Sequence, residues 1–167
     1  NKTALVTGAS DGIGAEFIQI LASRGYDLIL VARSEDKLNQ LAVKVGGQFG
    51  VNSTVIVADL SEPNAAQNLF QSIEEKGVDV DFLINNAGLL HNGFFTELNL
   101  AEQERMIVVN ILTLTSLTHL DANNMASKGG GHILNVASLA GWMAIPNQNV
   151  YAATKAYVLA FTQALSN

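Results

Sequence analysis

Tyr151 and Lys155 lie four residues apart in the segment VYAATKAYVLAFTQALSN, an alanine-rich stretch that favours a helix. This spacing places both side chains on one helical face. A lysine ammonium at about 4 Å stabilises a phenolate by up to about 4 kcal/mol at an effective dielectric near 20. The pair could therefore act as a general acid or base, although an isolated match of this kind is more often an ordinary surface pair.

A glycine-rich loop follows the first apolar run of the chain. The stretch TGASDGIG places Gly8, Gly12 and Gly14 in a GxxxGxG spacing before a helical pattern. Glycine lets the backbone turn tightly and approach a ligand, and the start of a helix offers free N–H groups to phosphates. The position of the loop favours dinucleotide binding over a plain tight turn, in a variant of the usual GxGxxG pattern.

Arg33 stands directly after the second apolar run. An acidic residue at this place binds a ribose 2′-hydroxyl, whereas arginine suits a 2′-phosphate. We therefore expect NADP(H) as the preferred cofactor, with NAD(H) as the alternative. A solvated surface arginine is the competing explanation, and Asp11 inside the glycine loop has the wrong charge to help a phosphate.

Polar residues also follow or interrupt the later apolar runs. Asp59 with Leu60 could bind an adenine edge, or could only cap a turn. The segment NNAG, residues 85–88, could let a cofactor lie across it, or could simply form an Asx-type turn. Asn110 lies in an otherwise apolar helical pattern, where asparagine is a poor helix former. Because a buried amide needs partners, Asn110 predicts either a satisfied core amide or a functional kink or water site. Ser138 ends the last apolar run, thirteen residues before Tyr151.

Five short apolar runs alternate with five longer helical patterns. The predicted strands are residues 3–7, 27–32, 51–58, 80–85 and 132–138, and the predicted helices are 12–24, 35–45, 63–76, 100–124 and 149–166. Near-continuous apolar strands are typical of parallel sheets buried on both faces, and their alternation with helices predicts βαβ units. We expect one doubly wound α/β/α Rossmann domain over residues 1–167, with its site at the carboxyl ends of the strands. Ser61 and Pro63 are expected to start the third helix.

Composition argues against several classes of function. The chain has 167 residues, a net charge of −6 and no cysteine. The charge argues against nucleic-acid and anionic membrane surfaces, and the lack of cysteine excludes disulfides and thiolate chemistry. Polar residues interrupt the apolar stretch around 106–117 and no leader is visible, so we expect a cytoplasmic protein without a membrane span. The three histidines have no metal-like spacing, and no metal site is expected.

Taken together and in this order, the motifs resemble the short-chain dehydrogenase/reductase family. TGASDGIG, NNAG, Asn110, Ser138 and YAATK match its cofactor and catalytic signatures, from residue 2 to the end of the chain. The stretches LILVARSEDKL and NVASLAG are further similar to the branch that contains bacterial ketone and 3-oxoacyl reductases.

The resemblance implies a role for each matching residue. Tyr151 would be the general acid in carbonyl reduction and the base in the reverse direction, and Ser138 would polarise the substrate oxygen. Lys155 would hold the nicotinamide ribose and favour the ionised form of Tyr151, while Asn110 would position a water that relays protons from Lys155. Dinucleotide contacts would come from Tyr151 and Lys155 together with Gly8, Ser10, Gly12, Ile13, Gly14, Arg33, Asp59, Leu60, Asn86, Ala87 and Gly88.

The sequence thus predicts an oxidoreductase that transfers a hydride between NADP(H) and a small-molecule carbonyl or secondary alcohol. A non-catalytic dinucleotide-binding or redox-sensing protein is the alternative, although such a protein has no need of Ser138 and Tyr151 at catalytic spacing. A scaffold or dimerisation fragment is a third hypothesis, because related proteins use the apolar faces of the helices at 100–124 and 149–166 for subunit packing. On this ground we also expect a homodimer or homotetramer.

Members of the family normally continue past the Tyr–Lys helix with two further strands and a segment that covers the substrate. Here the sequence ends at Asn167 within a helical pattern, and the strand at 132–138 would be an unpaired apolar edge. We therefore expect a longer natural chain, in which the additional residues select the substrate.

Overall fold

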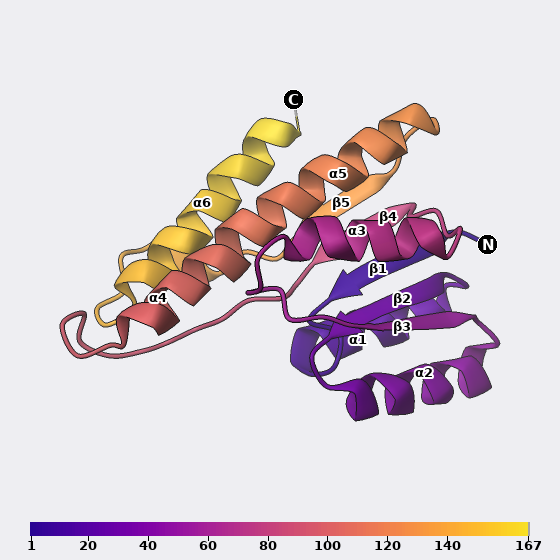
Figure 1. Cartoon of the computed structure of the whole chain (residues 1–167), viewed down its shortest axis with the longest axis horizontal. Helices are drawn as coiled ribbons and strands as arrows, with labels where there is room; N and C mark the ends of the chain where they lie inside the picture. The colour runs from indigo at the N-terminus through magenta and orange to yellow at the C-terminus, as the bar shows by residue number, and fades with distance from the viewer. Residues whose placement is uncertain (167) are drawn as a thin grey trace.

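The computed structural model describes residues 1–166 and contains one five-stranded sheet covered by helices (Figure 1). Every neighbouring pair of strands is parallel, in the order β3-β2-β1-β4-β5. The strands are β1 (Thr3–Thr7), β2 (Asp27–Ala32), β3 (Ser53–Val57), β4 (Phe82–Asn85) and β5 (His132–Asn135). The order reverses beside β1, and open sheets of this kind bind ligands at that point, beyond the carboxyl ends of the strands. The predicted doubly wound fold is confirmed.

Over residues 1–166, six α-helices and two short helical turns connect and follow the strands. The α-helices are α1 (Gly12–Ser23), α2 (Glu35–Phe49), α3 (Ala65–Glu75), α4 (Leu100–Ile107), α5 (Leu114–Ser127) and α6 (Asn149–Leu165). A π-helical turn, Val108–Thr113, joins α4 to α5, and a 3-10 turn, Leu139–Gly141, precedes α6.

Apolar side chains form one core on each face of the sheet because successive residues of a strand point to opposite faces. Ala4 and Val6 of β1 pack with side chains of α1 and α2, whereas Leu5 packs with side chains of α3 and α5. All three are fully buried. The double burial explains why β1 has no alternation of polar and apolar residues.

The expected start of the third helix is wrong. Helix α3 begins at Ala65, and Asn64 before it has a left-handed backbone with φ 57°. The Ser61 hydroxyl instead donates to the Asp59 carboxylate at 2.6 Å, and the Ser61 N–H donates to the same oxygen at 2.9 Å. Ser61 therefore shapes the turn after β3 instead of capping the helix.

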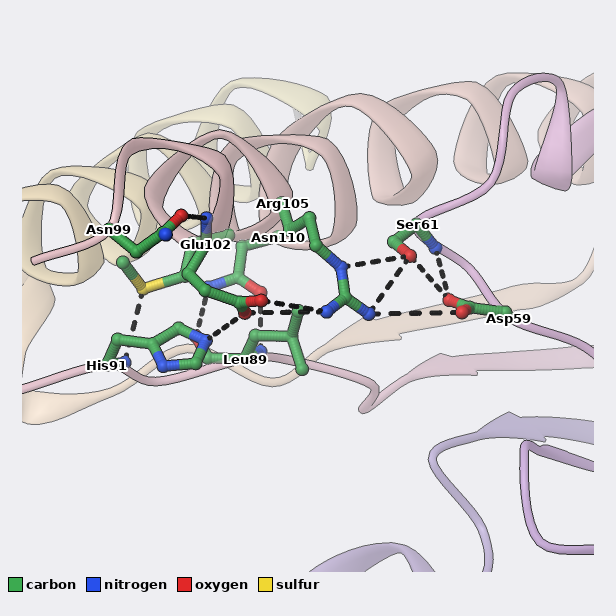
Figure 2. Close-up of polar contacts among 9 residues, drawn as sticks. Asp59, Ser61, Leu89, His91, Asn99, Glu102, Arg105 and Asn110 are labelled. Carbon is green, nitrogen blue, oxygen red and sulfur yellow. Dashed lines mark hydrogen bonds and ion pairs between the residues drawn. The ribbon is translucent and has the colours of Figure 1, made fainter.

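The helix predicted at 100–124 is divided into α4, the π-helical turn and α5. Asn110 lies within the π-helical turn, where the sequence predicted a kink as one of two outcomes. Single π-helical turns inside longer helices are frequent at functional sites. The interruption brings the Asn110 side chain toward the segment after β4 (Figure 2).

Within residues 1–166, no helix has the length and apolar character that crossing a membrane requires. The same part of the chain contains no group of three His, Asp or Glu side chains arranged to hold a metal ion.

Candidate active site

A cleft of about 540 Å³ lies beyond the carboxyl ends of β1, β2, β3 and β4. Its walls come from the segments that directly follow these four strands, and from α4 and the π-helical turn. The predicted site residues in the walls are Gly8, Ser10, Arg33, Asp59, Leu60, Ala87 and Gly88. The structure therefore brings together the glycine loop, the arginine after β2 and the NNAG segment, which are far apart in the sequence.

Close backbone contacts hold the glycine loop against the NNAG segment. Gly8 has φ 63°, and a Cβ on Gly14 would lie 2.0 Å from the Gly8 carbonyl oxygen. The Asn86 amide donates to the same oxygen at 3.1 Å. The Thr7 hydroxyl accepts from the N–H groups of Asn86 and Ala87, each at 3.0 Å. Thr7 was not predicted as a site residue, because nothing in its local sequence shows this long-range contact.

The remaining residues predicted in the loop lie at the start of α1. Gly12 has φ 51°, a left-handed conformation that favours glycine, and the Ile13 side chain is 61% exposed. The N-terminal N–H groups of α1 follow the loop directly, so they are available to an anion bound there.

We expect Gly14→Ala to lower the free energy of unfolding by about 3 kcal/mol, near the upper end of overpacking effects. The added methyl group would meet backbone atoms of Gly8, which cannot move without displacing the loop. Gly47→Ala in α2 is the matched control, because its Cβ would meet nothing within 4 Å. That variant should gain about 0.5–1 kcal/mol. Urea unfolding measures both, and a Gly14→Ala variant as stable as the parent would contradict the close approach.

Two basic side chains line the cleft on the β2 side, Arg33 and Lys37. The Lys37 ammonium is 2.8 Å from the Asp11 carboxylate. Hydrogen bonds from Lys37 and then Ser10 hold the pKa of Asp11 below its ordinary value. Lys37 thus balances the acidic charge in the glycine loop. The sequence prediction missed Lys37, although it lies four residues after Arg33, in the first turn of α2.

A chain of polar contacts runs from the cleft to the loop after β4 (Figure 2). The Arg105 guanidinium is 3.9 Å from the Asp59 carboxylate and 3.4 Å from the Ser61 hydroxyl. The same guanidinium is 3.3 Å from Glu102, whose carboxylate is 3.0 Å from the His91 ring. Hydrogen bonds from Ser61, followed by the charge of Arg105, lower the pKa of Asp59. Asp59 is therefore held ionised at the wall of the cleft.

The Asn110 side chain is buried and nearly saturated with hydrogen bonds. Its Oδ1 accepts from the Leu89 N–H at 2.9 Å, and its Nδ2 donates to the Leu89 carbonyl at 3.0 Å (Figure 2). The second Nδ2 proton goes to the Thr154 hydroxyl at 3.1 Å. Asn110 is therefore a buried amide with its hydrogen bonds satisfied, and it also lies at an interruption of the helix. The sequence had predicted a satisfied core amide and a kink as alternatives, and both are present. The predicted water position stays a prediction.

Lys155 is 5% exposed, and burial lowers its pKa. Its ammonium donates to the Val136 carbonyl at 3.1 Å and lies 5.8 Å from the centre of the Tyr151 ring. A Cβ on Gly88 would lie 3.5 Å from the same ammonium. Lys155 makes no ion pair with any residue from 1 to 166. A buried cation without a counter-charge favours a nearby anion.

Ser138 precedes the 3-10 turn, and its hydroxyl accepts from the Ala140 N–H at 3.2 Å. This turn packs tightly on α6, because a Cβ on Gly141 would lie 2.7 Å from the Lys155 carbonyl oxygen. The 3-10 turn that follows Ser138 and the π-helical turn that carries Asn110 both contact α6, the helix of Tyr151 and Lys155.

The chain matches the family model for short chain dehydrogenases over residues 2–167 and belongs to this family. Among curated relatives, the very-long-chain 3-oxoacyl-CoA reductase of Anas platyrhynchos is 34% identical, over 97% of this chain and 53% of the relative. The 7β-hydroxysteroid dehydrogenase of Collinsella aerofaciens is 33% identical, over 97% of this chain and 61% of the relative. The chain therefore spans between about half and two thirds of the length of these two relatives.

Solved structures with the same arrangement include a short-chain dehydrogenase from Sphingobium yanoikuyae in complex with NADPH. It superposes with a TM-score of 0.92 at 36% identity, over 99% of this chain and 65% of that chain. A second solved structure is the bulky-bulky ketone specific alcohol dehydrogenase from Comamonas testosteroni. It has a TM-score of 0.92 at 34% identity, over 99% of this chain and 66% of that chain.

Proposed function

We propose that this chain forms the cofactor-binding and catalytic part of an NADP(H)-dependent oxidoreductase that interconverts a carbonyl and a secondary alcohol. One observation carries the proposal. The buried ammonium of Lys155 has no ion-pair partner among residues 1–166, and it lies beside both the Tyr151 ring and Gly88, which lines the cleft. This arrangement supports a role for Tyr151 as proton donor and for Lys155 as a cation beside the reactive ring of a bound dinucleotide.

The residues of the cleft fit a nicotinamide dinucleotide. The glycine loop before α1 would bind the phosphates through backbone N–H groups. Asp59 and Leu60 would face the adenine, and Gly88 leaves room beside Lys155 that a larger side chain would fill. The cofactor supplies the hydride when it is bound. The NADPH complex of the similar Sphingobium dehydrogenase supports this assignment.

The protein's own groups would supply the proton transfer and the polarisation of the substrate. The Tyr151 hydroxyl would donate a proton to the carbonyl oxygen during reduction and accept it during oxidation. The Ser138 hydroxyl would donate a hydrogen bond to the same oxygen and stabilise its developing charge. Lys155 would hold the ribose hydroxyls and stabilise negative charge on Tyr151, because its ammonium is buried and has no counter-ion within residues 1–166. A panel of ketones, aldehydes and 3-oxoacyl thioesters, followed by nicotinamide absorbance with NADPH and NADH, tests the reaction.

We expect Arg33→Ala to remove most of a preference for NADPH over NADH. A charge-assisted contact to a 2′-phosphate contributes about 1.5–3 kcal/mol, or roughly tenfold or more in affinity. Lys37→Ala should weaken NADPH binding in the same direction, because Lys37 lines the same wall. NADH binding should change little in Arg33→Ala, since NADH lacks the 2′-phosphate. Titration of cofactor fluorescence measures the affinities.

Arg24→Ala is the matched control for this experiment. Arg24 is an exposed arginine at the end of α1, away from the cleft. Its removal should leave the ratio of the two affinities unchanged. Equal affinity of the unmodified protein for NADPH and NADH would show that Arg33 is an ordinary surface residue.

A further inference from the structure

The Thr154 hydroxyl lies between two elements of the candidate site. Its side chain is 1% exposed. The hydroxyl accepts from Asn110 Nδ2 at 3.1 Å and donates to the Tyr151 carbonyl at 2.7 Å. The hydroxyl therefore uses its one proton to bond Tyr151 and one lone pair to bond Asn110.

Thr154 completes a connection among three segments. Through Asn110 it is tied to both backbone groups of Leu89, the residue that follows Gly88. Through the Tyr151 carbonyl it is tied to the first turn of α6. These hydrogen bonds lie next to the point where Gly88, Asn110 and Lys155 come close together. A Cβ on Gly88 would be 3.5 Å from both Asn110 Oδ1 and the Lys155 ammonium.

A valine at position 154 keeps the shape of threonine and removes both hydrogen bonds. One Asn110 N–H would then be left buried without a partner, and unpaired buried polar groups are costly. The Asn110 amide would turn or shift to find water or another acceptor, and its two bonds to Leu89 would weaken. The Tyr151 carbonyl would lose the side-chain bond that restricts the first turn of α6.

We propose that Thr154 is a positioning residue, whose hydroxyl keeps the turn carrying Tyr151 and Lys155 in register with Asn110 and the segment after β4. The proposal rests on the proposed reductase function. Thr154 acts through Asn110 and Tyr151 and does not line the cleft. Its loss should therefore affect the rate of the chemical step far more than the binding of NADPH.

The chain offers a closely matched control at Thr162. This threonine is on the same helix and accepts a hydrogen bond from Asn135 Nδ2 at 3.0 Å. The contact is also between threonine and asparagine and is partly buried, but it lies about two helical turns beyond Lys155. Thr162→Val thus removes a threonine–asparagine bond on the same helix in which no residue of the cleft wall takes part.

The first experiment compares steady-state kinetics of the full chain and its Thr154→Val, Thr154→Ser and Thr162→Val variants with NADPH and the best ketone. Thr154→Val should lower kcat by about tenfold or more, because both hydrogen bonds of the hydroxyl are lost and one buried Asn110 N–H is left without a partner. Its affinity for NADPH should stay within about twofold. Thr154→Ser keeps the hydroxyl and should restore most of kcat, and Thr162→Val should resemble the unmodified chain.

The second experiment is independent of turnover. Amide hydrogen exchange should be about tenfold or more faster at Leu89 in Thr154→Val, because the Asn110 acceptor becomes mobile. Thr154→Ser and Thr162→Val should leave it unchanged. If the unmodified chain reduces no ketone, the reductase proposal fails and the exchange result alone decides whether Thr154 holds the site geometry. The positioning role would be overturned if Leu89 exchanged equally fast in Thr154→Val and Thr162→Val. It would also be overturned if exchange at Leu89 were faster in Thr154→Val but its kcat were unchanged.

Discussion

Replacing Tyr151 by phenylalanine is expected to lower kcat by about 10²–10⁴-fold, the usual range for a lost general acid or base. The substitution removes only the phenolic oxygen and keeps the ring that lies 5.8 Å from the Lys155 ammonium. Affinity for NADPH should therefore stay within about twofold. Ser138→Ala should lower kcat by about 10²–10³-fold, because it removes a hydrogen bond to the reacting oxygen.

Tyr157→Phe is the matched control for Tyr151→Phe. Tyr157 is on the same helix, and its hydroxyl is 2.8 Å from the Thr115 hydroxyl in an exposed contact. Its ring stacks on Phe161, which preserves the packing when the hydroxyl is removed. Kinetics of this variant should match those of the unmodified chain. A Tyr151→Phe variant with more than about a tenth of the original kcat would rule out Tyr151 as the proton donor.

The second large effect concerns Asp121, a buried carboxyl on α5 far from the cleft. It is 1% exposed, and its Oδ2 has no hydrogen-bond partner in the described part of the chain. The residue lines a small cavity with the charged groups Glu74, Asp79 and Lys128, of which Lys128 pairs with Asp79. Burial raises the pKa of Asp121 from its ordinary 3.8 to about 7.

The free energy of unfolding should therefore fall as the pH rises from about 4 to about 7. In this window the folded chain keeps the Asp121 proton, whereas the unfolded chain has lost it, so unfolding releases a proton. The full difference is roughly 4 kcal/mol, at about 1.36 kcal/mol for each pH unit. The pKa values of Asp11, Asp27 and Asp59 are lowered in the folded chain. Their effect on the free energy of unfolding therefore appears below about pH 4 and does not overlap with that of Asp121.

Urea unfolding of Asp121→Asn at a series of pH values tests this expectation. The variant should lose the decline between about pH 4 and 7 and be more stable than the unmodified chain at the upper end. Glu74→Gln is the control, since Glu74 is an exposed carboxyl that lines the same cavity. It should keep the decline. Parallel pH profiles for Asp121→Asn and the unmodified chain would show that Asp121 finds a partner in solution.

The fold could be predicted because its strongest signals are local. Each strand is a short apolar run, and each is followed by a helical pattern, which is enough to define a parallel sheet. Helix ends were less accurate. Helix α2 continues through two glycines to Phe49, where Gly50 ends it with φ 69°, and no local pattern indicated which glycine would do so. Asn64 took the left-handed backbone before α3, although Ser61 and Pro63 carried the usual start signals.

The sequence predicted part of the wall of the cleft, but not the contacts that hold it together. Gly8, Arg33, Asp59 and Gly88 line one cleft as the strand ends required. The contacts that hold the site link residues far apart in sequence and depend on packing that no local pattern encodes. Examples are the bonds of Thr7 to the NNAG segment, of Lys37 to Asp11, of Arg105 to Ser61 and of Thr154 to Asn110.

Transfer of deuterium from the cofactor to a product tests the central proposal most directly. The chain is incubated with NADPH deuterated at the transferable C4 position and a panel of ketones, and the alcohols are analysed by mass spectrometry. We expect one deuterium at the carbinol carbon of at least one alcohol, and no such product with Tyr151→Phe. Tight NADPH binding without any deuterated alcohol across the panel would contradict the enzymatic function and identify a dinucleotide-binding protein without catalysis.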